Sequence, residues 1–227
     1  MPPGFFNRIE SVLYAERINA YRQDGADELM TLARYMLNMA LSESLYSSLQ
    51  FAEIALRNSI HAALTHRAKS DEWYNTSPFL LSWQHGKVDE ARTSLKKRGK
   101  EMTSGRVVAE LSFGFWTAFF NKGSDRNGIG HYLASTAFPH APKPERSLRR
   151  LARRWENIRR LRNRVFHHER IIHWGDLSRR HEEILELIAW MEPDLEILTR
   201  EADRFKEIYH AGIGPWYQRI CARWGAV

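Results

Sequence analysis

The sequence predicts an all-α protein, and three observations support this prediction. Apolar residues recur at three- and four-residue intervals through most of the chain, which is the spacing of one helix face. No segment shows a convincing alternation of apolar and polar residues, as a half-buried strand would. Gly and Pro residues gather between the periodic segments, where they end helices instead of interrupting them.

The composition indicates a globular, reduced protein. Its 227 residues suit a single domain, and a hydrophobic fraction of 43% with eight Trp and eleven Phe can form a sizeable core. No run of about 18 apolar residues occurs, so no transmembrane helix is expected. The opening MPPGFFNRIE lacks the features of a signal peptide, and Cys221, the only cysteine, excludes an internal disulfide. We therefore expect a cytoplasmic protein with no membrane partner.

Long helices are expected in the first third of the chain. Residues 5–22 have helical periodicity, and Gly25 is placed to end that helix. Asp27 can cap the next periodic segment, which continues to about Arg67. That segment is too long for one straight globular helix. We expect a break near its middle, with Ser42 capping the second part.

The central part should contain two helices and a connector. A basic segment is expected to be helical until Gly99, and residues 107–120 are apolar nearly all round, as a central core helix would be. Gly114 within that helix would permit close approach of a neighbour or a bend. Residues 121–147 are rich in Gly, Pro and Ser and predict an irregular connector, with one short helix around residues 132–137.

Three helical segments follow the connector. An arginine-rich helix begins near residue 146, and after a turn at Gly175-Asp176 another helix runs until Pro193. A further helix and a tail complete the chain. The tail places Trp216, Ile220 and Trp224 on one face, which should pack on the bundle. The expected core helices are Leu41–Arg67, Val107–Phe120, Arg146–His168 and Leu177–Met191.

The net charge of +7 comes from 34 basic and 27 acidic residues. Ten arginines lie between residues 146 and 170, against only Glu156 and Glu169. A phosphate backbone would relieve the repulsion within such a helix, which favours a nucleic-acid partner. The alternative is an ordinary solvated face whose arginines pair with neighbouring Glu residues.

The most informative stretch is RRLRNRVFHHERIIHW, residues 159–174. At about 100° per residue, apolar residues before and within this stretch form one stripe. This stripe consists of Leu148, Leu151, Trp155, Ile158 and Val165. Arg162 lies in the middle of the stripe, where its permanent charge must find anions or acceptors. Asn163 and His167 share the adjacent flank, so the sequence predicts either a structural polar network or a functional site.

Arg162-Asn163-x-x-x-His167 resembles the R-x4-6-H motif of HEPN ribonucleases, in the form with a polar residue after the arginine. The phrase RLRNRVFHHERI is similar to the Abi-like family of abortive-infection proteins, a HEPN branch. LSESLYSSLQFAEIALRNSIHAALTHR and LSFGFW resemble the same family. Phe166 and Arg170 depart from the expected pattern by adding bulk and charge beside the motif.

The resemblance implies a HEPN-like helical bundle with additional helices, as one domain over residues 1–227. It also implies a homodimer in which two motifs form one composite site. The activity implied is metal-independent RNA cleavage by the 2′-hydroxyl, giving a 2′,3′-cyclic phosphate and a 5′-hydroxyl. His167 would be the general base or acid, Arg162 would stabilise the phosphorane, and Asn163 would orient the imidazole or phosphate.

Further residues are expected to support catalysis or bind RNA. Glu53 and Arg57 are four apart in the favourable order for a helical ion pair. Apolar neighbours favour a buried role for this pair over a surface salt bridge. Arg57-Asn58-x-x-His61 echoes the motif one residue short, and His61 is expected in the core or at its rim. The remaining supporting candidates are Arg159, Arg164, His168 and Arg170.

Other chemistries have little support in the sequence. The histidines at 167, 168, 173 and 181 lack metal-ligand spacing and lie among arginines, so no metal or other cofactor is expected. No nucleophile elbow, Walker loop or dinucleotide fingerprint is present. The resemblance implies a toxin-like phage-defence protein that is restrained until infection. The inhibitor would be a protein antitoxin or a non-coding RNA, and the basic surface favours the RNA. The alternative is a HEPN-type module that binds RNA or protein without cutting.

Overall fold

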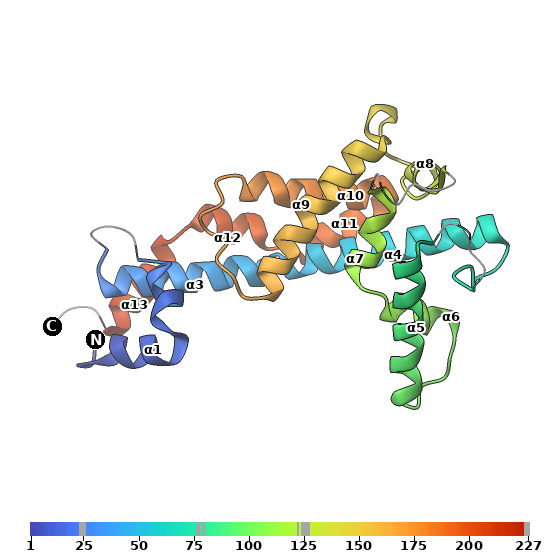
Figure 1. The fold of residues 1–227 in the computed structure, drawn as a ribbon. Helices are drawn as coiled ribbons and strands as arrows, with labels where there is room; N and C mark the ends of the chain where they lie inside the picture. Colours follow the sequence, from blue (N-terminus) through green and yellow to red (C-terminus); the bar gives the residue numbers. More distant parts are fainter. Residues whose placement is uncertain (23–25, 76–77, 79, 122, 124–127, 225–227) are drawn as a thin grey trace. The chain divides into compact units, whose positions relative to one another are not determined.

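All regular structure in the described chain is helical, which confirms the predicted fold class (Figure 1). The computed structural model describes residues 1–22, 26–75, 78, 80–121, 123 and 128–224. Within these ranges no helix is long and apolar enough to cross a lipid bilayer. The HEPN-like topology and the dimer stay predictions.

The chain divides into two units, and each is described here by itself. Unit 1 comprises Met1–Ser47, Leu161–His181 and Ala202–Val227, and unit 2 comprises Ser48–Arg160 and Glu182–Glu201.

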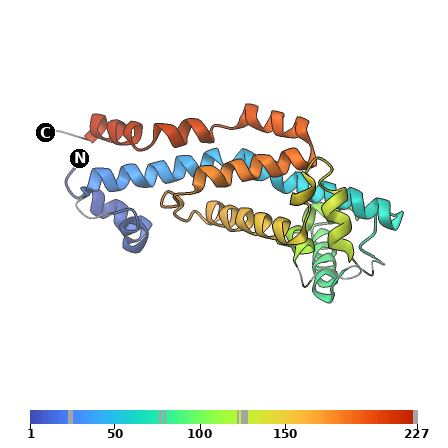
Figure 2. The ribbon, with the colours of Figure 1, turned by 90° about the horizontal axis from the view of Figure 1, so that it is seen from above.

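Unit 1 is organised along α3 (Glu28–Ser44). Along this helix lie α12 (Phe205–Ala211) and α13 (Gly214–Trp224), as seen from above in Figure 2. One buried cluster of this unit consists of Phe6, Ile18, Leu32, Ala33 and Ile220. Trp216 and Trp224 pack against it, so the predicted apolar face of the tail is confirmed.

The helix predicted over residues 5–22 is two helices, α1 (Phe5–Leu13) and α2 (Ala15–Asn19). Tyr14 separates them with a left-handed backbone, φ +65°, that a continuous helix does not allow. Gly25, expected to end the helix, lies outside the described residues.

The predicted cap of α3 is confirmed, whereas the predicted break is misplaced. The Met30 amide donates to the Asp27 carboxylate at 2.6 Å, as at a helix N-cap. Ser42 is not a cap, because α3 continues to Ser44 and α4 (Tyr46–Ala68) begins after Leu45. Leu45 itself keeps a right-handed helical backbone, so no capping side chain is needed there.

Asp203 breaks the helix that the sequence predicts as continuous after Pro193. Its carboxylate accepts from the Phe205 amide at 2.8 Å, at the start of α12. The same carboxylate is hydrogen-bonded to the buried His181 imidazole, whose ring stacks on Phe205 with centroids 4.4 Å apart. A buried carboxylate and imidazole that bond each other favour this turn over a continuous helix.

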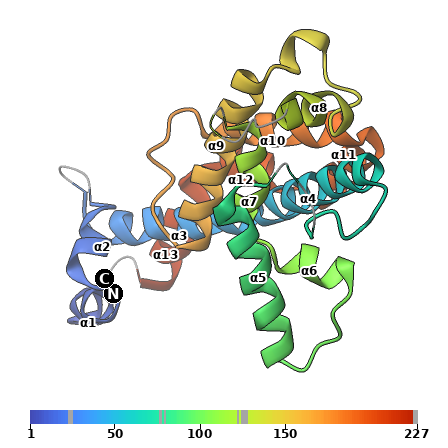
Figure 3. The same ribbon diagram turned by 45° about the vertical axis from the view of Figure 1, so that its right-hand side comes forward.

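Unit 2 has an aromatic core. Its helices include α5 (Ser82–Lys97), which lies beside α6 (Ser104–Glu110) in Figure 3. The largest fully buried side chains of the unit are Trp73, Tyr74, Phe115, Trp116, Phe119, Phe120, Phe138 and Trp155. Edge-to-face contacts join several of these rings, for example Trp73 with Trp116 at 6.2 Å between centroids.

The prediction of one continuous helix over residues 107–120 is wrong. Leu111 adopts an extended backbone, and the chain forms α6, then α7 (Phe113–Thr117) and η1 (Ala118–Phe120). Gly114 causes neither a bend nor a close approach. A Cβ at that position would meet only Ser112 Oγ, at 3.9 Å.

The remaining elements follow the sequence prediction with small shifts. The connector contains α8 (Ile129–Thr136) and the short η4 (Lys143–Glu145), and α9 runs from Leu148 to Phe166. The predicted bounds of α10 (Leu177–Met191) are confirmed. As predicted, α10 ends just before Pro193, and Pro193 also begins α11 (Pro193–Ala202), because the first helical turn tolerates a residue without an amide hydrogen.

Candidate functional site at the end of helix α9

The end of α9 is an αL-type cap formed by an unusual residue. The His168 amide donates to the Val165 carbonyl at 3.1 Å and the Glu169 amide donates to the Arg164 carbonyl at 2.8 Å, which is the Schellman pattern. His168 has φ +57°, at the position where glycine is usual. A non-glycine residue in this conformation costs roughly 1–2 kcal/mol. The strain is therefore concentrated directly beside the predicted motif.

Arg162 lies at the edge of the buried stripe and not in its middle. Leu161, which is fully buried, occupies the place between Ile158 and Val165 that the sequence analysis gave to Arg162. Arg162 is half-buried, and its guanidinium carbon lies 4.3 Å from the centroid of the Phe166 ring. This cation–π contact is one of the interactions that hold the side chain at the end of α9.

His167 is the most accessible member of the predicted motif. It follows the last helical residue, and its amide donates to the Asn163 carbonyl at 2.8 Å. Its side chain is exposed, and no described residue hydrogen-bonds to its imidazole. Arg162, Asn163 and His167 thus lie together in unit 1, with the imidazole facing solvent.

The flanking arginines are engaged in different ways. Arg164 forms an ion pair with Glu169 at 3.0 Å, and Arg170 donates to the Ala20 carbonyl. Arg159, which belongs to unit 2, pairs with Glu156 at 2.8 Å.

Part of α9 carries a row of exposed arginines. Arg149, Arg153 and Arg160 are exposed, and the described residues offer none of them a carboxylate within ion-pair distance. At about 100° per residue they lie within roughly 40° of one another on unit 2. The alternative of a solvated face whose arginines pair with Glu residues thus holds for Arg150, Arg154 and Arg159, which form ion pairs, while the row is solvated without a described partner.

The second Arg-Asn pair lies on α4 in unit 2, whereas Arg162, Asn163 and His167 belong to unit 1. Glu53 and Arg57 are half-buried and Asn58 is exposed, and Arg57 Nε donates to Asn58 Oδ1 at 3.2 Å. The Glu53–Arg57 ion pair stays a prediction. His61 accepts from Trp73 Nε1 at 2.9 Å, and burial lowers the pKa of its imidazole. Its expected place at the rim of the core is confirmed.

The clustered histidines do not gather as metal ligands. No three His, Cys, Asp or Glu side chains of the described ranges are arranged to hold a metal ion. Burial, with Arg170 and Arg164 nearby, lowers the pKa of His173, which favours its neutral form. His181 is committed to Asp203.

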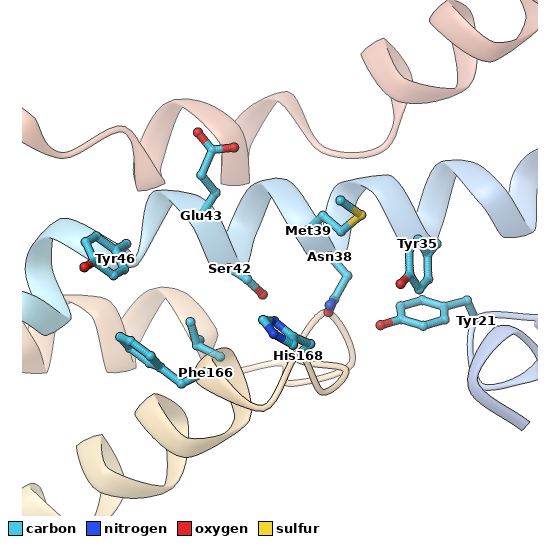
Figure 4. A pocket seen from close by; sticks show the side chains of 10 residues that line it. Tyr21, Tyr35, Asn38, Met39, Ser42, Glu43, Tyr46, Phe166 and His168 are labelled. Atoms are coloured by element: carbon cyan, nitrogen blue, oxygen red, sulfur yellow. The ribbon is translucent and has the colours of Figure 1, made fainter. Parts of the chain in front are cut away.

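A cavity of about 380 Å³ lies between α3 and the end of α9 (Figure 4). Phe166 and His168 line it on the α9 side, but Arg162, Asn163 and His167 are not among its lining residues. Facing them are Tyr21, residues of α3 (Tyr35, Asn38, Met39, Ser42 and Glu43) and Tyr46 at the start of α4. The sequence did not identify these residues as part of a site, because no local spacing relates residues 21–46 to residues more than a hundred positions later.

Asn38 and Tyr21 show how this cavity is built. Asn38 Oδ1 accepts from the Ile171 amide at 2.7 Å and Nδ2 donates to the Glu169 carbonyl at 3.3 Å, which ties the loop after α9 to α3. Burial, reinforced by Tyr35, raises the pKa of Tyr21 to about 12 despite the nearby Arg17 and Arg170. The Tyr21 hydroxyl therefore keeps its proton at neutral pH.

Comparisons with known proteins complete the description of the site. No protein-family model and no curated protein matches the sequence, and no solved structure matches the fold. The HEPN resemblance consequently rests on the motif and on the other two phrases of the sequence that resemble the Abi-like family.

Proposed function

We propose that the chain is a metal-independent endoribonuclease, with Arg162, Asn163 and His167 as its catalytic residues. The observation that carries the proposal is the contrast between the two ends of the motif. His167 is exposed with its imidazole unengaged by described residues, whereas Arg162 is half-buried against Phe166. A reacting proton carrier must be accessible, and an electrostatic group works best when it is held in place beforehand.

The cleavage step uses the 2′-hydroxyl of RNA as nucleophile. Its oxygen attacks the adjacent phosphorus, its proton passes to a neutral imidazole, and the P–O bond to the 5′-oxygen breaks as that oxygen receives a proton. The products are a 2′,3′-cyclic phosphate and a 5′-hydroxyl. Arg162 balances the charge that develops on the phosphorane oxygens, and Asn163 orients the imidazole or the phosphate.

Two copies of the motif serve one reaction in this proposal. His167 follows the last residue of α9, and each chain supplies one imidazole and one guanidinium to the reaction. A homodimer with facing motifs brings a second imidazole and a second guanidinium to the same phosphate. One imidazole then acts as base while the other acts as acid.

The biological setting is proposed from the family resemblance. The chain acts as a toxin-like phage-defence protein and is restrained by a non-coding RNA that binds its basic surface. The exposed Arg149, Arg153 and Arg160 support an RNA partner. Sequencing the nucleic acid that co-purifies with the protein tests this restraint, and purely heterogeneous host RNA would count against it.

The test of the activity is cleavage of end-labelled RNA by the purified full chain in excess EDTA. Wild type should release cyclic phosphate and 5′-hydroxyl ends, and Arg162→Ala and His167→Ala should each reduce the rate on the order of 10²-fold or more. His66→Ala, an exposed histidine in unit 2, is the matched control and should cut normally. Cleavage that requires added metal and leaves a 5′-phosphate would refute the mechanism.

The second candidate function is RNA binding without cleavage. It is favoured by the same exposed arginine row, which does not depend on the motif. If wild type and both motif variants bind RNA tightly and none cuts it, this reading replaces the first.

A further inference from the structure

Two cavities of unit 1 share a wall at the end of α9. The first is the 380 Å³ cavity described above, hereafter the aromatic cavity. The second, hereafter the arginine cavity, measures about 250 Å³ and is lined by Arg17, Arg164 and Arg170. Tyr21 and His168 line both cavities. One ligand can therefore occupy both, with chemically different ends.

The aromatic cavity suits a flat, polar-edged ring. The rings of Tyr46 and Phe166 approach to 5.8 Å between centroids at 37°, yet remain 52% and 37% exposed (Figure 4). Exposed aromatic faces beside a cavity are typical stacking platforms for nucleobases. The largely apolar wall also carries the Ser42 hydroxyl, whose oxygen is buried and has no described hydrogen-bond partner. A hydroxyl both donates and accepts, so it can bond either kind of base edge.

The arginine cavity suits an anion. Arg17 donates to the His168 carbonyl and Arg170 to the Ala20 carbonyl, and neither acceptor carries a charge. Among the described residues, Glu169 is the only acidic one that lines the cavity, and it is paired with Arg164 at 3.0 Å. Three cations face one carboxylate, so the cavity has net positive charge. Guanidinium groups recognise phosphate well because their fork of donors matches its oxygens.

We propose that these two cavities bind one nucleotide, with the base stacked in the aromatic cavity against Tyr46 and Phe166 and its phosphate in the arginine cavity. The Ser42 hydroxyl contacts the base edge, and Arg17 and Arg170 contact the phosphate. The nucleotide is either free or one unit of an RNA chain.

The site also deepens the proposed ribonuclease function, and in its RNA form it rests on that function. His167 lies in sequence between Phe166 and His168, whose side chains line the aromatic cavity. A base held there places its RNA strand beside the exposed imidazole. The cavity would then select which unpaired base lies next to the cleaved bond.

Calorimetric titration of the full chain tests the proposal, with the four nucleoside 5′-monophosphates, the matching nucleosides and inorganic phosphate as probes. At least one monophosphate should bind, and about tenfold more tightly than its nucleoside. Tyr46→Ala should weaken both by about tenfold, while Tyr46→Phe keeps the ring and the affinity. Because Tyr46 is half exposed, circular dichroism should show both variants folded. Failure of all monophosphates to bind, or unchanged binding by Tyr46→Ala, overturns the proposal.

The phosphate end is tested separately. Arg170→Gln should reduce the affinity for the monophosphate and leave that for the nucleoside unchanged. Arg219→Gln, on α13 and lining neither cavity, is the control and should bind as wild type. Equal losses for nucleotide and nucleoside in Arg170→Gln would show that the arginine only supports the fold and would overturn the phosphate assignment.

A five-nucleotide RNA and the His167→Ala chain distinguish the two sources of the ligand. An affinity tenfold or more above that of the monophosphate assigns the site to RNA, and equal affinity assigns it to a free nucleotide. Nucleotide binding without RNA cleavage by wild type would leave the site standing and remove the ribonuclease proposal. Cleavage without nucleotide binding would leave the ribonuclease proposal standing and remove the nucleotide site.

Discussion

The guanidinium of Arg162 lies over the ring of Phe166, one helical turn later, with 4.3 Å between the guanidinium carbon and the ring centroid. In the sequence, Phe166 departs from the family pattern by adding bulk beside the motif. In the structure the same ring restrains the arginine.

Replacing Phe166 with Leu should therefore impair catalysis even when RNA is saturating, in addition to any loss of base stacking in the aromatic cavity. A cation–π contact of this kind contributes about 1 kcal/mol, so kcat should fall roughly fivefold at saturating RNA. Phe166→Tyr keeps the aromatic face and should retain the wild-type kcat. Single-turnover cleavage at saturating protein separates this effect from altered affinity. An unchanged rate in Phe166→Leu would show that the stacking does not position Arg162 for the reaction.

Arg153 and Arg154 are adjacent but should respond oppositely to substitution. Arg153→Ala should leave the free energy of unfolding unchanged, because the side chain is exposed and makes no ion pair with a described residue. It should weaken RNA binding and reduce the slope of log K against log salt by about one. Filter binding at several salt concentrations measures that slope.

Arg154→Ala should instead destabilise unit 2. Its guanidinium is mostly buried, pairs with Glu186 at 2.5 Å and Glu145 at 3.3 Å, and lies over the Trp190 ring at 4.5 Å. Removing it leaves the buried Glu183, 3.8 Å away, without this cation. We expect a loss of about 3 kcal/mol in urea unfolding. Equal stability of the Arg153→Ala and Arg154→Ala chains would contradict both predictions.

His61 should make the protein less stable in mild acid. Burial lowers the pKa of this imidazole in the folded chain, and its Nδ1 accepts a hydrogen bond from Trp73. The unfolded chain, with the ordinary pKa of about 6.5, then binds the proton more readily. The stability contributed by neutral His61 is fully present above pH 6.5. It is lost as the pH falls from 6.5 through the lowered pKa of His61 in the folded chain.

The pH effect is measured by urea unfolding at pH 7.5 and pH 5.5, followed by tryptophan fluorescence. Wild type should lose more stability between the two conditions than His61→Gln, which has no titrating group at this position. Identical losses in the two proteins would assign the pH dependence to other groups, such as His173.

His168→Gly should stabilise unit 1 by roughly 1 kcal/mol, because glycine adopts φ +57° without strain. His168→Ala keeps a Cβ in the same backbone conformation and should show no such gain. Thermal unfolding of the two variants compares them directly. The glycine chain should also bind nucleotide less well, since His168 lines both cavities of the proposed site. A stabilised chain with reduced binding would show that strain is retained here for function.

The sequence by itself determined the fold class and the elements whose causes are local. The bounds of α10 and the Asp27 cap follow from apolar spacing and from a side chain that bonds an amide three residues away. The apolar face of the tail is another case, since Ile220 is buried as its helical spacing predicts. Such features depend on neighbours along the chain, which the sequence displays directly.

Only the tertiary structure decided where helices break and which residues meet. Leu111 leaves the helix although the apolar pattern continues, and Asp203 breaks another because it satisfies a buried His181. The cavity at the end of α9 joins Ser42 and Tyr46 to His168. Their proximity is set by how α3 packs in unit 1, and packing between distant segments leaves no periodic trace in the sequence. The motif was therefore readable from its spacing, whereas the cavity beside it became visible only in the folded chain.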